Sequence, residues 1–125
     1  MGSKNYLKQD APFRVPTDDG KLIEEHFGGA SLNGAAFSVA RMVAPAGWGE
    51  PAQKPDFDEI TMVVRGRKRI EVDGEAVELG PNESILVRRG ARVRYCNPFA
   101  EELEYWSVCI PAFSPETVHR EDPAA

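Results

Sequence analysis

The chain has 125 residues, of which 42% are hydrophobic and 28% are charged. This balance is typical of one soluble globular domain with a single core, and it excludes a disordered chain. The formal net charge of -5 disfavours binding to nucleic acid, and no apolar segment is long enough to span a membrane. With no secretory signal, Cys96 and Cys109 are expected to be reduced thiols in a cytoplasmic protein.

The order of elements predicts an all-β domain between two short terminal segments. Residues 1–34 mix polar and scattered apolar side chains, which predicts an extended N-terminal arm that packs on or pairs with a partner subunit. Residues 35–113 contain short strand-like runs between Gly, Pro and Asn breaks, which favour a sandwich or small barrel. The predicted strands are residues 36–43, 59–65, 69–72, 75–79, 84–88, 92–96 and 103–110. Residues 114–125 form a tail with one helical turn after Ser114 and with His119 exposed.

The stretch RGRKRIEVDGEAVEL predicts a basic strand followed by a hairpin. Asp73 and Gly74 supply a two-residue turn with positive φ between the two strands. The basic run at residues 65–69 alternates with apolar positions and has no aromatic platform for stacking bases. We therefore interpret it as a solvated strand face rather than a nucleic-acid site.

Both alternating sets of the strand EITMVVR are largely apolar. Such a strand is expected to be covered on both faces, by a second sheet on one side and by a sheet or another subunit on the other. This pattern and the N-terminal arm predict a homodimer. The two sets are Glu59, Thr61 and Val63 on one face and Ile60, Met62 and Val64 on the other.

Two runs of residues have the spacing of known sequence motifs. In the first, Gly47, Gln53, Pro55, Glu59 and Gly66 follow the intervals G, five residues, H-x-H, three or four residues, E, six residues, G. This spacing resembles the first motif of the cupin superfamily, whose members fold as jelly-roll β-barrels.

The second run, RRGARVRYCN, resembles the second cupin motif, P-x-G, two residues, H, three residues, N. Gly90 and Asn97 are in place, whereas Arg88 replaces the proline and Val93 replaces the histidine. The resemblance implies a cupin jelly-roll barrel or sandwich over residues 35–113, and subunits that pair through sheet faces and N-terminal strands.

In the cupin superfamily, three histidines and one glutamate hold the metal. Most of these ligand residues are missing from this sequence. Only Glu59 remains of that set, so at most Gln53 and Glu59 could contact a divalent metal. Ligand number and type determine metal affinity, and these two residues predict a degenerate metal site without a tightly bound cofactor.

The same alignment selects candidate residues for a small-molecule pocket. It points Glu59 and Thr61 into the barrel, where a carboxylate suits a catalytic acid or base. The alternative is that Glu59 accepts structural hydrogen bonds at the mouth of the barrel. Gln53 is a candidate at that mouth. Val93 and Tyr95 should face inward from the second motif, with core packing as the alternative role of Tyr95.

Two further candidates depend on strand orientation. Arg41 shares a strand face with apolar residues, from which it would either pair with Glu59 or extend outward along its stem. The last strand leaves open which of its alternating sets faces inward; if the inward set contains Trp106, that ring is a candidate for ligand contact. The two sets are Tyr105, Ser107 and Cys109, and Trp106, Val108 and Ile110.

The runs DFDEITMVVRG and YWSVCIPAF are similar to the cupin of ethanolamine utilisation. That branch has also lost the histidines and is associated with acetate kinase activity. No phosphate-cradling Gly-rich loop or Walker-type lysine accompanies the similarity here, so it supports the metal-poor pocket and not the activity.

Three functions remain open from the sequence. The first is an enzyme that acts on a small polar or carboxylated metabolite, with Glu59 as acid or base. The second is a metabolite-binding module without turnover, or a structural homodimer with a vestigial pocket. The third is an acetate-kinase-like cupin of the ethanolamine-utilisation type.

Overall fold

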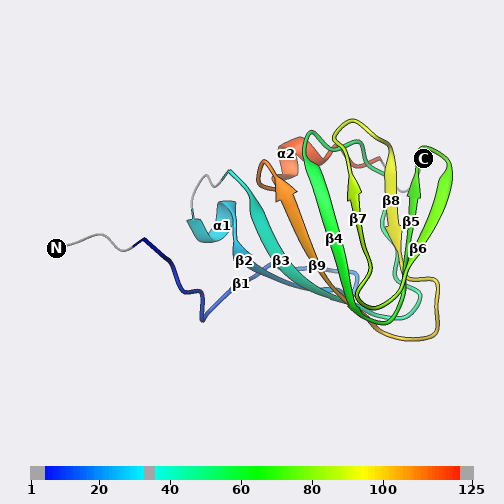
Figure 1. The fold of residues 1–125 in the computed structure, drawn as a ribbon, viewed down its shortest axis with the longest axis horizontal. Coiled ribbons are helices and arrows are strands. Elements are labelled where there is room, and N and C mark those ends of the chain that lie inside the picture. Colours follow the sequence, from blue (N-terminus) through cyan, green and yellow to red (C-terminus); the bar gives the residue numbers. More distant parts are fainter. Residues whose placement is uncertain (1–4, 33–35, 122–125) are drawn as a thin grey trace.

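The computed structural model describes residues 5–32 and 36–121, and its strands form two facing antiparallel sheets (Figure 1). Every strand predicted between residues 36 and 110 is present, with bounds that shift by up to two residues. The elements are β1 Phe13–Arg14, β2 Leu22–Phe27, α1 Gly29–Leu32, β3 Ser38–Ala44, β4 Asp58–Arg65, β5 Lys68–Val72, β6 Glu75–Leu79, β7 Ser84–Val87, β8 Val93–Cys96, β9 Leu103–Ile110 and α2 Pro115–Val118.

The larger sheet has the strand order β1-β2-β3-β9-β4-β7, and the smaller one has the order β6-β5-β8. Residues that are paired directly across neighbouring strands lie on the same face of a sheet. The pairs Ala40↔Ser107 and Thr61↔Ser107 therefore place β3, β9 and β4 side chains on one inward face. This register decides the orientation of the last strand: Tyr105, Ser107 and Cys109 are buried.

The predicted hairpin is confirmed. Lys68↔Leu79 to Val72↔Glu75 pair in β5 and β6, and Asp73 has a φ of 47° while Gly74 has a φ of 87°. Both turn residues thus adopt the left-handed conformation that a tight two-residue connection requires. The helical turn after Ser114 is also present, with Pro115 as its first residue.

The N-terminal segment pairs within its own chain. β2 lies along β3 from Leu22↔Val43 to Phe27↔Val39, and β1 pairs with β2. β3 pairs with β9 on one side. On its other side, β2 forms the hydrogen bonds that the backbone groups of β3 would lack at an open sheet edge. Residues 22–27 thus belong to the large sheet of their own chain, and the pairing of the arm with a partner subunit stays a prediction. Residues 1–4 and 33–34 of the predicted arm lie outside the described part of the chain.

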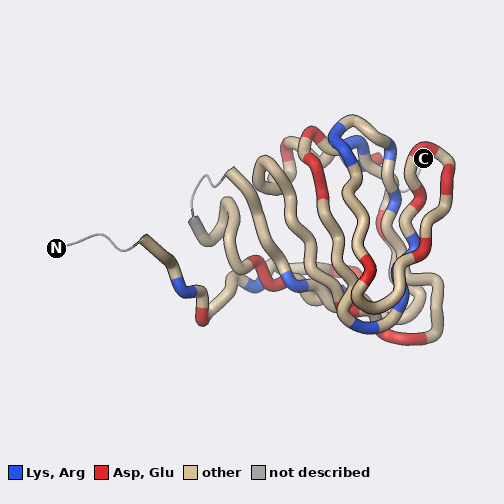
Figure 2. Tube along the Cα trace, viewed as in Figure 1, with Lys and Arg blue, Asp and Glu red and all other residues tan. Residues whose placement is uncertain are grey.

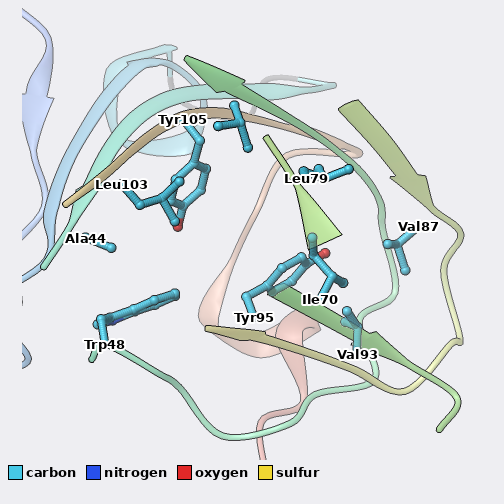
Figure 3. Packing of buried hydrophobic residues seen from close by; sticks show 10 residues of the cluster. Ala44, Trp48, Ile70, Leu79, Val87, Val93, Tyr95, Leu103 and Tyr105 are labelled. Carbon is cyan, nitrogen blue, oxygen red and sulfur yellow. The ribbon is translucent and has the colours of Figure 1, made fainter. Parts of the chain in front are cut away.

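The main core lies between the two sheets. Figure 3 shows Trp48, Tyr95 and Tyr105 pointing into the same interior space from three different segments. Ile70 of the small sheet and Leu103 of the large sheet pack in the same core, and both are fully buried. Within the described residues, no helix has the length and apolarity that crossing a bilayer requires.

The two faces of β4 have different surroundings. Glu59, Thr61 and Val63 are buried, which confirms the inward set. On the opposite face, the Met62 and Val64 side chains are 47% and 49% exposed. The second cover expected for this strand is thus absent from the described part of a single chain.

We expect Gly66→Ala to destabilise the fold more than Gly74→Ala. Both glycines have positive φ, at 83° and 87°, so alanine at either position carries a strain of roughly 1–2 kcal/mol. Of the two, only at Gly66 would the new Cβ also clash with a backbone atom, the Glu102 carbonyl oxygen. Urea unfolding of the two variants measures the difference, and equal losses would contradict the close approach at Gly66.

Candidate functional site

A cavity of about 240 Å³ lies between the sheets. Its walls come from β2, β3, β9 and β4 of the large sheet and from β5 and β8 of the small sheet. The loop at residues 50–53, the segment at residues 15–19 and Arg120 complete the wall. The cavity therefore combines segments that are far apart in the sequence.

Glu59 is 9% exposed and lies on the cavity wall, which confirms the inward orientation predicted from the alternation. Its Oε2 atom accepts a hydrogen bond of 2.5 Å from the Ser107 hydroxyl. Ser107 is placed for this contact because Thr61 of β4 pairs with it across the sheet. The carboxylate is therefore held in a defined position at the inner surface of the large sheet.

Lys68 is the unexpected charge in the cavity, because the basic run was predicted to be a solvated face. Its side chain is 1% exposed, with Nζ 3.4 Å from the ring centroid of Tyr105 and 4.4 Å from that of Tyr95. Within the described residues, Nζ has no hydrogen-bond or ion-pair partner, and Glu59 and Glu50 act on it only as nearby charges. Burial and the neighbouring Lys21 lower the pKa of Lys68 to about 7.

The error at Lys68 has a simple structural reason. In β5, Lys68 and Ile70 point the same way, into the sandwich, whereas Arg69 points outward. The arginines of the run behave as predicted, since each is partly exposed and pairs with surface carboxylates. These pairs are Arg65 with Glu102 at 3.0 Å, Arg67 with Glu78 at 2.8 Å and Arg69 with Glu71 at 3.3 Å.

A second buried lysine, Lys21, also lines the cavity, and its Nζ atom lies 5.5 Å from the ring centroid of Tyr105. The Nζ atom of Lys21 is 3.9 Å from Glu50 Oε2 and 4.3 Å from the ring centroid of Trp48. Burial lowers the pKa of Lys21, while the Glu50 and Glu59 charges oppose this shift. Asp19 accepts the Trp48 indole hydrogen at 2.8 Å and so fixes the ring beneath the lysine.

The mouth of the cavity is built around Gln53. Its backbone pairs with Val93 in both directions, at 2.9 and 2.8 Å, which aligns the loop with β8. Its side-chain Oε1 accepts a hydrogen bond of 3.1 Å from Arg120 Nε, and Arg120 also lies 3.5 Å from Glu50. The predicted tail thus packs on the domain and supplies a cation to its mouth, while His119 beside it is half-exposed and pairs with Asp56.

Three buried hydroxyl groups lack a hydrogen-bond partner within bonding distance among the described residues: Ser31 Oγ, Thr61 Oγ1 and Tyr95 OH. Tyr95 lines the cavity, and burial together with the Glu59 charge raises its pKa, so the phenol stays protonated and available as a donor. Thr61 and Val93 are buried in the core and are not part of the cavity wall.

Arg41 and Trp106, two candidates from the sequence, lie on the opposite face of the large sheet. Arg41 pairs with Glu24 at 2.9 Å and with Glu104 at 2.8 Å, and Trp106 stacks on His26 with ring centroids 4.9 Å apart. Both face outward because their strand neighbours Met42 and Tyr105 take the inward positions. Neither side chain lines the cavity, so the prediction that they contact a ligand there is corrected.

The side chains at the metal-ligand positions of the cupin motifs do not form a metal site. Pro55 and Val93 offer no ligand atom, Gln53 Oε1 is occupied by Arg120, and Glu59 shares its cavity with the buried Lys68. Among the described residues, no three His, Cys, Asp or Glu side chains gather in a way that could hold an ion. Tight binding of a metal ion needs enough nitrogen and oxygen ligands, and these side chains do not supply them.

Among the cavity residues that the sequence reasoning missed are Lys21, Glu50, Lys68 and Arg120. Lys68 carried a usable signal, because the hairpin register puts it on the same face as Ile70. The other three lie in a loop or near the ends of the chain, and no local period points them inward. Their positions depend on which strand each segment joins.

We expect Lys68→Met to stabilise the protein most strongly at low pH. The folded-state pKa of about 7 lies below the ordinary value of 10.5, so the folded protein holds a buried ammonium below about pH 7 and loses this cost as the pH rises toward 10.5. The gain in the free energy of unfolding, measured in urea, should therefore be larger at about pH 6 than at about pH 9.5.

Lys54→Met is the matched control, because Lys54 is exposed on the loop beside Gln53. It should change stability little and equally at both pH values. A Lys68→Met variant that loses stability at low pH would show that the ammonium is better compensated than the structure indicates.

The Cupin_2 family model, described as a cupin domain, matches residues 40–111. A protein of Myxococcus xanthus (strain DK1622) named Endoribonuclease YbeY is 50% identical over 109 residues, which are 87% of this chain. Those residues are 37% of that protein, so the chain spans only about a third of this relative.

Two solved structures show the same fold at low sequence identity. A variant of Streptomyces PAC13 with uridine has a TM-score of 0.73 and 18% identity, covering 96% of this chain and 92% of that one. A putative ethanolamine utilization protein from Salmonella typhimurium LT2 has a TM-score of 0.58 and 17% identity, covering 74% and 71%. The similarity to the ethanolamine-utilisation cupin is thus confirmed at the level of fold. The family match over more than half of the chain, together with the two facing sheets, establishes that this chain belongs to the cupin family.

Proposed function

We propose that this cupin domain binds a small polar, carboxylated metabolite between its sheets and that Glu59 exchanges a proton with it. The observation that supports the proposal best is the buried Lys68 ammonium, which lines the cavity without a carboxylate partner among the described residues. An uncompensated buried cation is costly, and an anionic ligand would relieve this cost.

The other two cations of the cavity wall already have a carboxylate nearby, and the wall also carries the carboxylates of Asp18, Asp19, Glu25, Glu50 and Glu59. Lys21 and Arg120 both approach Glu50, at 3.9 and 3.5 Å, so these two cations already share one carboxylate. Lys68 is then the cation that is free to meet a ligand carboxylate. The volume of about 240 Å³ lies below the usual range of drug-sized sites, which restricts the ligand to a small metabolite.

Glu59 has the position that a proton-transfer group needs. One of its oxygens is fixed by Ser107, and the carboxylate lies in a cavity wall that also carries the Tyr95 hydroxyl. A general acid or base must be held within hydrogen-bond reach of the ligand, and the Ser107 contact supplies that restraint. Cys109 is a poor alternative nucleophile, because burial and the Glu59 charge raise the pKa of its thiol.

The likeness to named proteins gives limited support. The Streptomyces structure contains uridine, a small polar metabolite, in a protein of similar length and fold. The Salmonella protein is named for ethanolamine utilization, and an acetate-kinase-like activity stays an alternative without a phosphate-binding loop to support it. The Myxococcus protein is named an endoribonuclease, but RNA is not part of this proposal, since Arg65, Arg67 and Arg69 are already paired with carboxylates.

We further propose that two copies pair through the outer face of the large sheet. Figure 2 shows the middle of β4, β7 and β9 without charged residues. On this face Met62, Val64 and Leu86 are each nearly half-exposed, and β4, β7 and β9 are neighbours in the sheet. A contiguous apolar patch of this kind is typical of an interface, and a second copy offers the same uncharged surface.

We expect Glu59→Gln to abolish turnover of a substrate while ligand binding and the fold persist, because glutamine keeps the shape and cannot exchange the proton. Native mass spectrometry of the purified protein identifies co-purifying molecules. Calorimetry with those molecules then compares the dissociation constants, and a product assay compares the rates. Glu75→Gln, on the exposed hairpin, is the control.

The outcomes separate the functional alternatives. If binding is retained and no substrate is consumed by either protein, the domain is a binding module. Failure of a panel of small carboxylates to bind the original protein would overturn the proposal and leave a structural homodimer with a vestigial pocket.

We expect Met62→Glu to convert the dimer to a monomer, because two carboxylates would be buried near each other at the interface. Light scattering at micromolar concentration measures the mass. Ala76→Glu places the same charge on the exposed face of β6 and should leave the dimer intact. A monomeric original protein would exclude this interface.

A further inference from the structure

The geometry points to a chemical role for Lys68: we propose that its Nζ atom condenses with the carbonyl carbon of a small 2-oxo carboxylate to form an imine. This inference rests on the proposed function of the cavity, and it specifies the ligand class and the atom that reacts. It depends on where Lys68 lies and on what surrounds its amine.

The first support is that the amine is enclosed and directed at the ligand space. The Lys68 side chain is 1% exposed and lines the cavity. Tyr105 and Tyr95 present their ring faces to Nζ at 3.4 and 4.4 Å, so the stem is held between two rings. A lysine with so little freedom presents its nitrogen at one position in the cavity, which favours attack on a bound carbonyl group.

The second support is that the nitrogen has a free lone pair when it is neutral. Within the described residues, Nζ makes no hydrogen bond or ion pair that would retain its proton. The titratable groups facing it are Lys21, which disfavours the ammonium, the carboxylates of Glu59 and Glu50, which favour it, and the thiol of Cys109. Burial outweighs the carboxylates and brings the pKa of Lys68 to about 7, so a large share of the amine is neutral at neutral pH.

The third support is the set of polar groups around the amine. The Tyr95 hydroxyl is buried and lines the cavity beside the Glu59 carboxylate, and its proton is available for a hydrogen bond to the carbonyl oxygen. Lys21 lines the same cavity and would share its charge between Glu50, 3.9 Å away, and the ligand carboxylate, and Glu59 supplies a carboxylate that can carry a proton. A 2-oxo carboxylate offers both groups that this arrangement meets: a carbonyl for the amine and an anion for the cations.

The condensation balances without a further reactant. The Nζ lone pair attacks the carbonyl carbon and forms a C–N bond, and the carbonyl oxygen takes up a proton to give a carbinolamine. The C–O bond then breaks as the nitrogen lone pair forms the C=N bond. The two hydrogens of the neutral amine leave with that oxygen as one water molecule, with Glu59 carrying the proton between nitrogen and oxygen.

The test is chemical trapping of the imine. The full chain is incubated separately with glyoxylate, pyruvate and 2-oxoglutarate at neutral pH, and sodium borohydride is then added. Reduction of an imine adds the mass of the compound less one oxygen atom, which intact-mass and peptide mass spectrometry detect. We expect at least one of the three to modify Lys68, with a yield at least about tenfold above that at the exposed Lys54.

Two variants separate the amine from its charge. Lys68→Arg keeps a cation and removes the nucleophile, so it should lose the trapped adduct and still bind the carboxylate by calorimetry. Lys68→Met should lose both the adduct and most of the binding. Circular dichroism of each variant checks that the fold persists, and trapping in the unmodified chain does not depend on either variant folding.

Each result decides between the imine and the simpler anion site. Binding of a 2-oxo acid without modification of Lys68 would overturn the imine and leave the proposed function intact. Adducts spread evenly over exposed lysines would overturn it as well. If none of the three compounds binds or is trapped, the imine fails, and the panel of other carboxylates tests the proposed function separately.

Discussion

The burial of charge between the two sheets is the constraint on which the site depends. Lys68 projects from β5 into an interior that also receives Glu59 from β4 and Lys21 from the segment before β2. A charge in such a position is expensive unless something compensates it. Here the faces of Tyr95 and Tyr105 cover the Lys68 ammonium, and the carboxylates of Glu50 and Glu59 supply only part of the opposing charge.

This arrangement explains how a cupin can keep a polar interior after losing the imidazoles of the family motif. Val93 and Pro55 fill motif positions with apolar groups, and Gln53 turns its oxygen toward Arg120. The space between the sheets is consequently lined by ammonium, carboxylate and phenol groups instead of metal ligands. Such groups recognise anions and transfer protons, which is the chemistry proposed for this cavity.

The two faces of the large sheet have separate roles. The inner face carries Glu59, Ser107 and the cavity, whereas the outer face carries a central apolar surface beside the ion pairs of Arg41. Because side chains alternate along a strand, one strand such as β4 serves both faces. A substitution at Met62 therefore tests the proposed pairing of two copies without touching the cavity wall.

Local sequence determined the strands, the hairpin at Asp73 and Gly74, the inward direction of Glu59 and the membership of a cupin fold. These features depend on a period of two residues, on turn residues with positive φ and on motif spacing, all of which act over a few positions. Tertiary structure alone decided that Trp106 faces outward, that Arg41 pairs with Glu24, and that Lys21 and Arg120 reach the cavity. Those outcomes depend on the register between strands distant in sequence and on the packing of the terminal segments, and no local pattern encodes either.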